Sequence, residues 1–138
     1  MTAPFEGGCH CGAIRYRATA EPAGAAHCHC RDCQKTVGSA FTTFVFIPRD
    51  GIAITGQAKS YTVTSESGGK VTRSFCGECG SPVFSEVTSM PEMVFVKAGS
   101  LDDPSWVQPG MQFWTDRQQA WGKIPTEIMS FPQNPPQS

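Results

Sequence analysis

The sequence predicts a mainly β fold, and three features of its composition indicate this class. Leucine, a strong helix former, occurs once in 138 residues, as Leu101. Valine, isoleucine, threonine and phenylalanine, which favour strands, are plentiful. Fourteen glycines and eleven prolines interrupt the chain at short intervals. We therefore expect many short strands that form small antiparallel sheets joined by turns.

Runs of β-branched and aromatic residues between these interruptions indicate where the strands lie. The expected strands span residues 13–18, 40–47, 51–55, 59–64, 70–75, 82–86, 93–98 and 112–116. The polar, glycine-rich stretch 65–69 has the composition of a hairpin loop. One short helix is expected over residues 31–37, because Asp32 suits its first turn and Gly38 can end it.

Length and composition predict one globular domain over residues 1–138. A chain of 14.9 kDa with 39% hydrophobic residues suits a single modest core, which we expect to span about residues 5–128. Residues 130–138 contain three prolines and show no periodicity, and we expect a disordered tail there.

The charge balance excludes several kinds of partner. Lys+Arg number 11 and Asp+Glu 12, for a formal net charge of -1, so the basic surface of a nucleic-acid binder is not expected. No apolar run approaches the roughly 20 residues of a membrane-spanning helix. The first residues lack the charged-then-apolar pattern of a signal peptide. We expect a cytoplasmic protein with neither a nucleic-acid nor a membrane partner.

Seven cysteines are the unusual feature of the composition. An odd number in a reducing compartment fits no complete disulfide framework. They fall into three clusters, each with a spacing short enough to chelate one ion, at Cys9-His10-Cys11, Cys28-His29-Cys30-Arg31-Asp32-Cys33 and Cys76-Gly77-Glu78-Cys79.

These clusters divide into a closed and an incomplete zinc site. A structural zinc takes four thiolates, usually from two chelating pairs. The first and third clusters are such pairs, each followed by a glycine, Gly12 or Gly80, that permits a tight backbone turn. The predicted closed site, called the outer cluster below, consists of Cys9, Cys11, Cys76 and Cys79. The predicted incomplete site, the central cluster, consists of Cys28, Cys30 and Cys33. Three protein ligands leave one coordination position for chemistry, so two zinc ions are expected, one structural and one catalytic.

Other interpretations of the central cluster remain open at this stage. His27 or His29 could supply a fourth ligand and close the site. If the segment is extended, however, alternate side chains point to opposite faces, which separates both histidines from Cys28 and Cys30. An iron–sulfur centre normally takes four cysteines. A thioredoxin-like motif at Cys76-Gly77-Glu78-Cys79 needs a βαβ pattern that the sequence lacks.

The three clusters with their flanking residues resemble the glutathione-dependent formaldehyde-activating enzymes, a family grouped with centromere protein V. The matching segments are Gly8-Cys9-His10-Cys11-Gly12, His27-Cys28-His29-Cys30-Arg31-Asp32-Cys33-Gln34-Lys35, Arg73-Ser74-Phe75-Cys76-Gly77-Glu78-Cys79-Gly80 and Gly99-Ser100-Leu101-Asp102-Asp103. The resemblance implies an Mss4-like, zinc-stabilised β fold. It also implies a structural zinc at the outer cluster and a catalytic zinc at the central cluster.

The resemblance implies a carbon–sulfur lyase, or its reverse, the condensation of formaldehyde with glutathione to S-hydroxymethylglutathione. The expected partner is therefore a small thiol, with glutathione as the candidate. Zinc at the central cluster would bind the thiolate or polarise the carbonyl oxygen. The cations that could meet the substrate carboxylates are Arg31, Lys35, Arg49, Arg73 and Lys97. The alternative function is a zinc-stabilised β domain that binds a protein or peptide without catalysis.

Aromatic residues and one carboxylate complete the candidates. Trp106, Trp114, Trp121 and Phe113 crowd the last third of the chain. They could line a pocket mouth, but we expect them to cover the sheets. Glu78 lies between two predicted ligands and is expected to face solvent.

Overall fold

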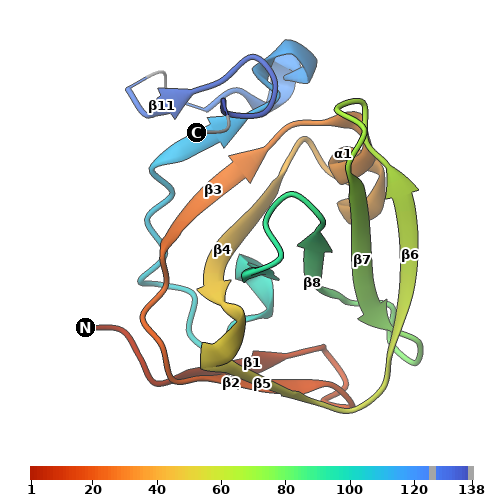
Figure 1. Cartoon of the computed structure of the whole chain (residues 1–138), viewed down its shortest axis with the longest axis vertical. Helices are drawn as coiled ribbons and strands as arrows, with labels where there is room; N and C mark the ends of the chain where they lie inside the picture. The colour runs from red at the N-terminus through yellow and green to blue at the C-terminus, as the bar shows by residue number, and fades with distance from the viewer. Residues whose placement is uncertain (125–126, 137–138) are drawn as a thin grey trace.

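Two β-sheets form the described part of the protein, in agreement with the mainly β prediction. The computed structural model describes residues 1–124 and 127–136. The three-stranded sheet has the order β1-β2-β5, and the eight-stranded sheet the order β11-β10-β3-β4-β9-β8-β7-β6. The smaller sheet closes one end of the larger one, and the long β6–β7 hairpin stands at one side (Figure 1). No helix in the described part of the chain is long and apolar enough to cross a membrane.

The elements follow the expected pattern of short strands and turns. The strands are β1 (Phe5–Gly8), β2 (Arg15–Ala18), β3 (Gly24–Cys28), β4 (Thr42–Pro48), β5 (Ile52–Thr55), β6 (Ala58–Thr64), β7 (Lys70–Cys76), β8 (Pro82–Val87), β9 (Met93–Lys97), β10 (Met111–Phe113) and β11 (Met129–Ser130). One α-helix, α1 (Arg31–Val37), and four 3₁₀ turns, Arg49–Gly51, Ala98–Ser100, Thr115–Arg117 and Ala120–Gly122, connect them.

The predicted helix is confirmed at its expected position. Cys30 precedes its first turn, and the Cys30 sulfur accepts a hydrogen bond from the backbone N–H of Cys33 at 3.3 Å. Gly38 ends the helix in a left-handed conformation with φ of 68°, and its N–H bonds the carbonyl of Gln34 at 2.8 Å. All eight expected strands occur, with some shifts in their bounds.

Strand β3 is missing from the sequence-based expectation, although it lies near the centre of the larger sheet. Its sequence, Gly-Ala-Ala-His-Cys, has no β-branched residue, so propensity gives no signal. It is held antiparallel to β4 and parallel to β10. Ala26 is fully buried between them. Strands β1 and β11 also lack a strand signature, because one contains two glycines and the other has two residues.

The larger sheet is apolar on both faces at its centre. Along β4, Val45 and Ile47 point to one face, where they pack with Val94 and Val96 of β9 against the smaller sheet. Phe44 and Phe46 point to the opposite face and belong to a second apolar cluster. The first face makes the main core, so the second is available to form a site.

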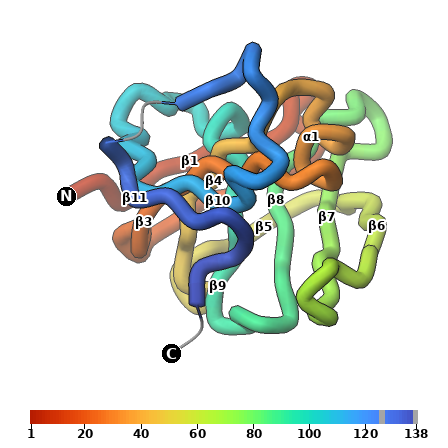
Figure 2. The backbone as a smooth tube through the Cα atoms, turned by 90° about the horizontal axis from the view of Figure 1, so that it is seen from above, coloured from red at the N-terminus to blue at the C-terminus, as the bar shows by residue number. Residues whose placement is uncertain are grey.

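The C-terminal segment differs from the disordered tail expected over residues 130–138. Strand β11 pairs with β10, and Figure 2 shows the segment running beside it. Trp114 and Thr115 donate backbone hydrogen bonds to the carbonyls of Gln133 and Phe131. These contacts are long-range in sequence, which is why local composition did not reveal them. Residues 137–138 lie outside the described part.

Candidate metal centres and a pocket on the larger sheet

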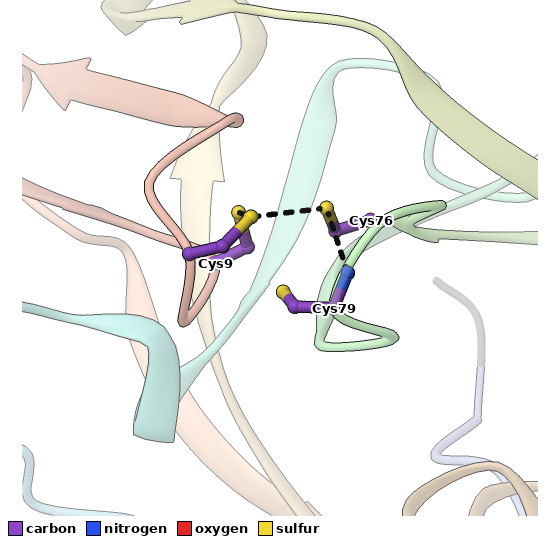
Figure 3. Close-up of side chains that lie close together, drawn as sticks. Cys9, Cys76 and Cys79 are labelled. Atoms are coloured by element: carbon purple, nitrogen blue, oxygen red, sulfur yellow. Dashed lines mark hydrogen bonds between the residues drawn. The ribbon is translucent and has the colours of Figure 1, made fainter.

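The outer cluster brings four sulfurs close enough together to bind one metal ion. Cys9 and Cys11 come from the turn between β1 and β2, whereas Cys76 ends β7 and Cys79 lies in the turn between β7 and β8. Cys9, Cys76 and Cys79 converge in Figure 3, and all four sulfurs lie within 4.8 Å of one another. The Sγ atom of Cys11 is 3.7 Å from those of Cys9 and Cys76. Zinc–sulfur bonds of about 2.3 Å place tetrahedral sulfurs about 3.8 Å apart, whereas a disulfide needs about 2.05 Å. The donor set therefore fits zinc.

Backbone N–H groups support these sulfurs. The N–H of Ile14 lies 3.2 Å from the Cys9 sulfur, and that of Glu78 lies 3.4 Å from the Cys76 sulfur. The glycine after each pair adopts the left-handed conformation expected from the sequence, with φ of 82° at Gly12 and 78° at Gly80. The hydrogen bond from the Ile14 N–H lowers the pKa of Cys9.

Ser81 contacts the sulfur of Cys79, the fourth residue of the outer cluster. Its hydroxyl lies 3.2 Å from the Cys79 Sγ atom. Hydrogen bonds from the Ser81 side chain and backbone lower the pKa of Cys79 to about 5. The neighbouring carboxylate, Glu78, is exposed, as predicted, and takes no part in the cluster.

The central cluster brings together three sulfurs. Cys28 ends β3, Cys30 lies just before α1, and Cys33 lies in its first turn. The three sulfurs are within 4.8 Å of one another, and no His, Asp, Glu or further Cys in the described residues joins them. Cys33, in the first turn of α1, can face Cys28 and Cys30 because the chain changes direction at Cys30. The cluster is thus a three-sulfur chelate.

The histidines lie on the opposite side of the segment, as the strand alternation predicts. His27 Nδ1 bonds the Thr43 hydroxyl at 2.7 Å. Burial, followed by the nearby charge of His29, lowers the pKa of His27 to about 4. His29 is fully buried, and its Nε2 lies 2.8 Å from Oε1 of Gln112. The geometry therefore does not support a site closed by either histidine.

Two cations lie beside the central sulfurs. Arg73 Nη2, from β7, lies 3.6 Å from the Cys33 sulfur. Lys97, from β9, is 7% exposed, and its Nζ donates a hydrogen bond to the Thr42 hydroxyl at 2.9 Å. Burial lowers the pKa of Lys97. Hydrogen bonds from the Cys28 and Cys30 thiols, and then the charges of Lys97 and Arg73, hold the pKa of Cys33 well below its usual value.

A pocket of about 830 Å³ opens in front of the central cluster. One wall of it is a face of the larger sheet, because residues two apart on a strand share a face and register partners point to the same side. The face residues that line it are Cys28, Thr42, Phe44, Phe46, Val71, Arg73, Ser85, Val87, Met93, Phe95, Lys97, Met111 and Phe113. The sulfurs and cations lie at one end of this face.

The mouth of the pocket is bordered by two segments far apart in sequence. One is the loop between β6 and β7, which forms the predicted hairpin turn. The other is the C-terminal part of the chain, which contributes Arg117 and Asn134. Arg117 Nη2 lies 3.2 Å from Oε1 of Glu66, and Asn134 Nδ2 donates a hydrogen bond to the Ser67 hydroxyl at 3.4 Å. These contacts join the two segments across the mouth.

The expected cations divide according to the face on which each lies. Arg31, Arg73 and Lys97 line the pocket, whereas Lys35 and Arg49 do not. Arg49 instead pairs with Glu86 at 2.5 Å. Sequence reasoning missed Arg117 and Lys70, which also line the pocket. Lys70 lies three residues before Arg73 on the predicted strand 70–75, so strand alternation alone would have placed it on the opposite face.

The aromatic residues of the last third play different roles. Phe113 and Trp114 are buried as expected, but both also line the pocket. Trp106 packs on Phe5 with ring centroids 5.0 Å apart. Trp121 is 72% exposed and covers no sheet.

Comparison with known proteins assigns the family. The sequence profile of the glutathione-dependent formaldehyde-activating enzymes matches residues 4–117. The chain belongs to this family. Two curated relatives, from Penicillium rubens and Halomonas elongata, are each 29% identical to the chain, over 114 and 103 residues. Both bear the name "Putative glutathione-dependent formaldehyde-activating enzyme".

The shared region covers part of each protein. It includes 76% of this chain and 59% of the Penicillium relative, and 71% of this chain and 66% of the Halomonas relative. A crystal structure of a Rhodobacter sphaeroides protein matches with a TM-score of 0.57 at 22% identity, over 75% of this chain and 91% of that one. This likeness indicates a shared fold, and the two cysteine clusters present donor sets able to hold metal ions.

Proposed function

We propose that this protein is a zinc-dependent enzyme that joins a thiol to an aldehyde, or catalyses the reverse carbon–sulfur cleavage. The thiol would be glutathione. The simplest aldehyde would be formaldehyde, which the family is named for. One observation carries the proposal: three sulfurs gather at the end of a pocket with two cations beside them. The described residues offer no fourth protein ligand.

Cys28, Cys30 and Cys33 would hold the catalytic ion. When bound there, zinc supplies Lewis acidity, which acidifies a thiol or polarises a carbonyl oxygen. The outer cluster would hold a second zinc that ties the β1–β2 turn to the β7–β8 turn. With four sulfurs it is closed, so its role would be structural.

Arg73 and Lys97 would balance the charge of the loaded site. Three thiolates and a dication leave one negative charge, and a substrate thiolate makes it two. The two cations supply two positive charges next to these sulfurs. They would thereby favour the thiolate over the thiol of the substrate.

Lys97 would also act on the aldehyde oxygen. In the addition, a sulfur electron pair forms the carbon–sulfur bond, and the carbonyl π pair moves to oxygen, which then takes a proton. The Nζ atom of Lys97 is a buried donor in the pocket wall and would stabilise the developing negative charge. Arg31, Lys70 and Arg117 also line the pocket and could pair with the glutathione carboxylates.

Cobalt substitution tests the open coordination position. The protein loaded with cobalt at the central cluster should change its visible spectrum when glutathione is added. Cys30→Ser should abolish this change, and Lys35→Met, which alters an exposed cation outside the pocket, should not. A spectrum that glutathione leaves unchanged would contradict the proposal and favour the binding-domain alternative.

Exchange spectroscopy tests catalysis directly. The zinc-loaded chain should accelerate the interconversion of formaldehyde, glutathione and S-hydroxymethylglutathione, measured by NMR with labelled formaldehyde. Lys97→Met should slow it on the order of a hundredfold if the Nζ donor stabilises the oxyanion. The same rate with and without the protein would refute catalysis of this reaction.

A further inference from the structure

The pocket is divided into a polar end and an apolar end. The three sulfurs, Arg73 and Lys97 occupy the polar end. Phe44 is the register partner of Lys97, and Phe46 that of Phe95. On this face Thr42 is followed along β4 by Phe44, and Phe95 precedes Lys97 along β9. The face therefore changes from polar to aromatic over two residues of each strand. A molecule held at the sulfurs meets an aromatic wall as it extends along the sheet.

Four phenylalanines form that wall as one packed group. Phe44 and Phe95 have ring centroids 5.1 Å apart, and Phe46 and Phe95 4.9 Å apart. Phe113 of β10 lies 6.1 Å from Phe44. These rings hold one another in place, so the wall is preformed. It can accept an apolar group without rearrangement of the core.

Three more apolar side chains, two of them flexible methionines, extend the wall at its far end. Val87, Met90 and Met93 line the pocket and pack on the phenylalanine group. Methionine adapts its shape to an irregular apolar ligand. The arrangement is unusual for a one-carbon substrate, because formaldehyde offers almost no apolar surface to bury. Peptide groups of glutathione would lose hydrogen bonds to water against such a wall.

We propose that the aldehyde joined to the thiol at this site carries a bulky apolar group, a long alkyl chain or an aromatic ring. This rests on the proposed thiol–aldehyde chemistry and specifies its carbonyl substrate. The sulfur and the reacting carbon lie at the polar end, and the apolar group lies on the phenylalanine wall. The glutathione part extends toward Arg31 and Arg117, two further cations that line the pocket. The reaction is balanced: thiol and aldehyde give one hemithioacetal, with no other reactant.

Binding of stable thioethers tests the wall without catalysis. S-methylglutathione and S-hexylglutathione are titrated into the zinc-loaded full chain by calorimetry. Each methylene that enters the wall should tighten binding about fourfold, so the hexyl compound, which has five more methylenes than the methyl compound, should bind up to about a thousandfold tighter. Its heat-capacity change should also be more negative. Equal dissociation constants for the two compounds would overturn the inference.

A double variant tests whether the preference for S-hexylglutathione arises at the apolar wall. The double variant Val87→Thr with Met90→Gln places polar atoms on the wall and should reduce the preference for S-hexylglutathione on the order of tenfold. The control Met129→Gln changes an exposed methionine outside the pocket and should leave the preference intact. An unchanged preference in the double variant would contradict the assigned wall.

Rates with aldehydes separate this inference from the proposed function. Hexanal and phenylacetaldehyde should give a higher kcat/KM with glutathione than formaldehyde does. Acceleration of formaldehyde alone, with equal binding of both thioethers, would refute the inference and leave the proposed function standing. Tighter binding of S-hexylglutathione without acceleration of any aldehyde would support the apolar wall and refute the function.

Discussion

The charge of Arg73 should control how strongly the central cluster binds a thiolate. Arg73 Nη2 lies 3.6 Å from the Cys33 sulfur, from a half-buried position on β7. Two unit charges at that distance interact by about 4 to 5 kcal/mol at an effective dielectric constant of 20. Relaxation and water reduce this, so we expect Arg73→Gln to cost about 2 kcal/mol, or about thirtyfold in thiolate affinity.

The sign of the accompanying pH effect follows from the lost cation. Without Arg73 the thiolate form is less favoured, so the apparent pKa of the bound thiol should rise. Glutathione binding to the cobalt-loaded protein should then require a higher pH. The assay is a spectrophotometric titration with glutathione at several pH values.

Arg17→Gln is a matched control for the effect of removing any positive charge from the protein. Arg17 lies on β2, away from the pocket, and its Nη1 is 3.6 Å from Oε2 of Glu6 in an exposed pair. An exposed pair contributes little, so Arg17→Gln should leave glutathione affinity and its pH dependence unchanged. If Arg73→Gln behaved like Arg17→Gln, the charge of Arg73 would not control thiolate binding.

Three further perturbations test other parts of the account. Cys28→Ser should lower the zinc content from two to one per chain while circular dichroism still shows a folded protein, whereas Cys76→Ser should unfold it; identical behaviour of the two variants would contradict the division of roles. Gly80→Ala should cost about 1 to 2 kcal/mol because φ is 78° there, and thermal unfolding should show a Tm several degrees lower. Gly99→Ala, at a position with open space and no positive φ, is the control and should leave the Tm unchanged. Glu66→Gln removes the ion pair across the mouth and should speed glutathione association in stopped-flow measurements; an unchanged rate would exclude a barrier at the mouth.

The features that the sequence predicted well are local. The helix 31–37 has its end signal at Gly38, and the chelating pairs have spacings that bring sulfurs together within one turn. Alternation along an extended strand separated His27 and His29 from the cysteines, and the structure agrees. Such features depend on a few neighbouring residues and not on pairing with distant segments of the chain.

The features that the sequence did not reveal depend on pairing between distant segments. Strand β3 is extended because β4 and β10 flank it, although its own residues are small. Arg73 and Lys97 could be named as cations, but their approach to Cys33 depends on the register of β7, β8 and β9. Arg117 reaches the mouth through a 3₁₀ turn that has no sequence signature.

The pocket itself illustrates the same limit. Phenylalanines at 44, 46 and 95 suggest only a buried sheet when they are considered one by one. Register places them on the same face as the central sulfurs, and that face is turned away from the main core. The combination of a chelating cluster with an aromatic wall is therefore a property of the sheet.

We propose that Cys28, Cys30 and Cys33 hold an ion whose remaining coordination position binds the substrate thiol. A crystal structure of the zinc-loaded protein soaked with glutathione, with zinc anomalous scattering measured, tests it most directly. We predict two zinc ions per chain and the glutathione sulfur bonded to the ion at the central cluster. A fourth protein ligand on that ion, or glutathione bound elsewhere, would contradict the claim.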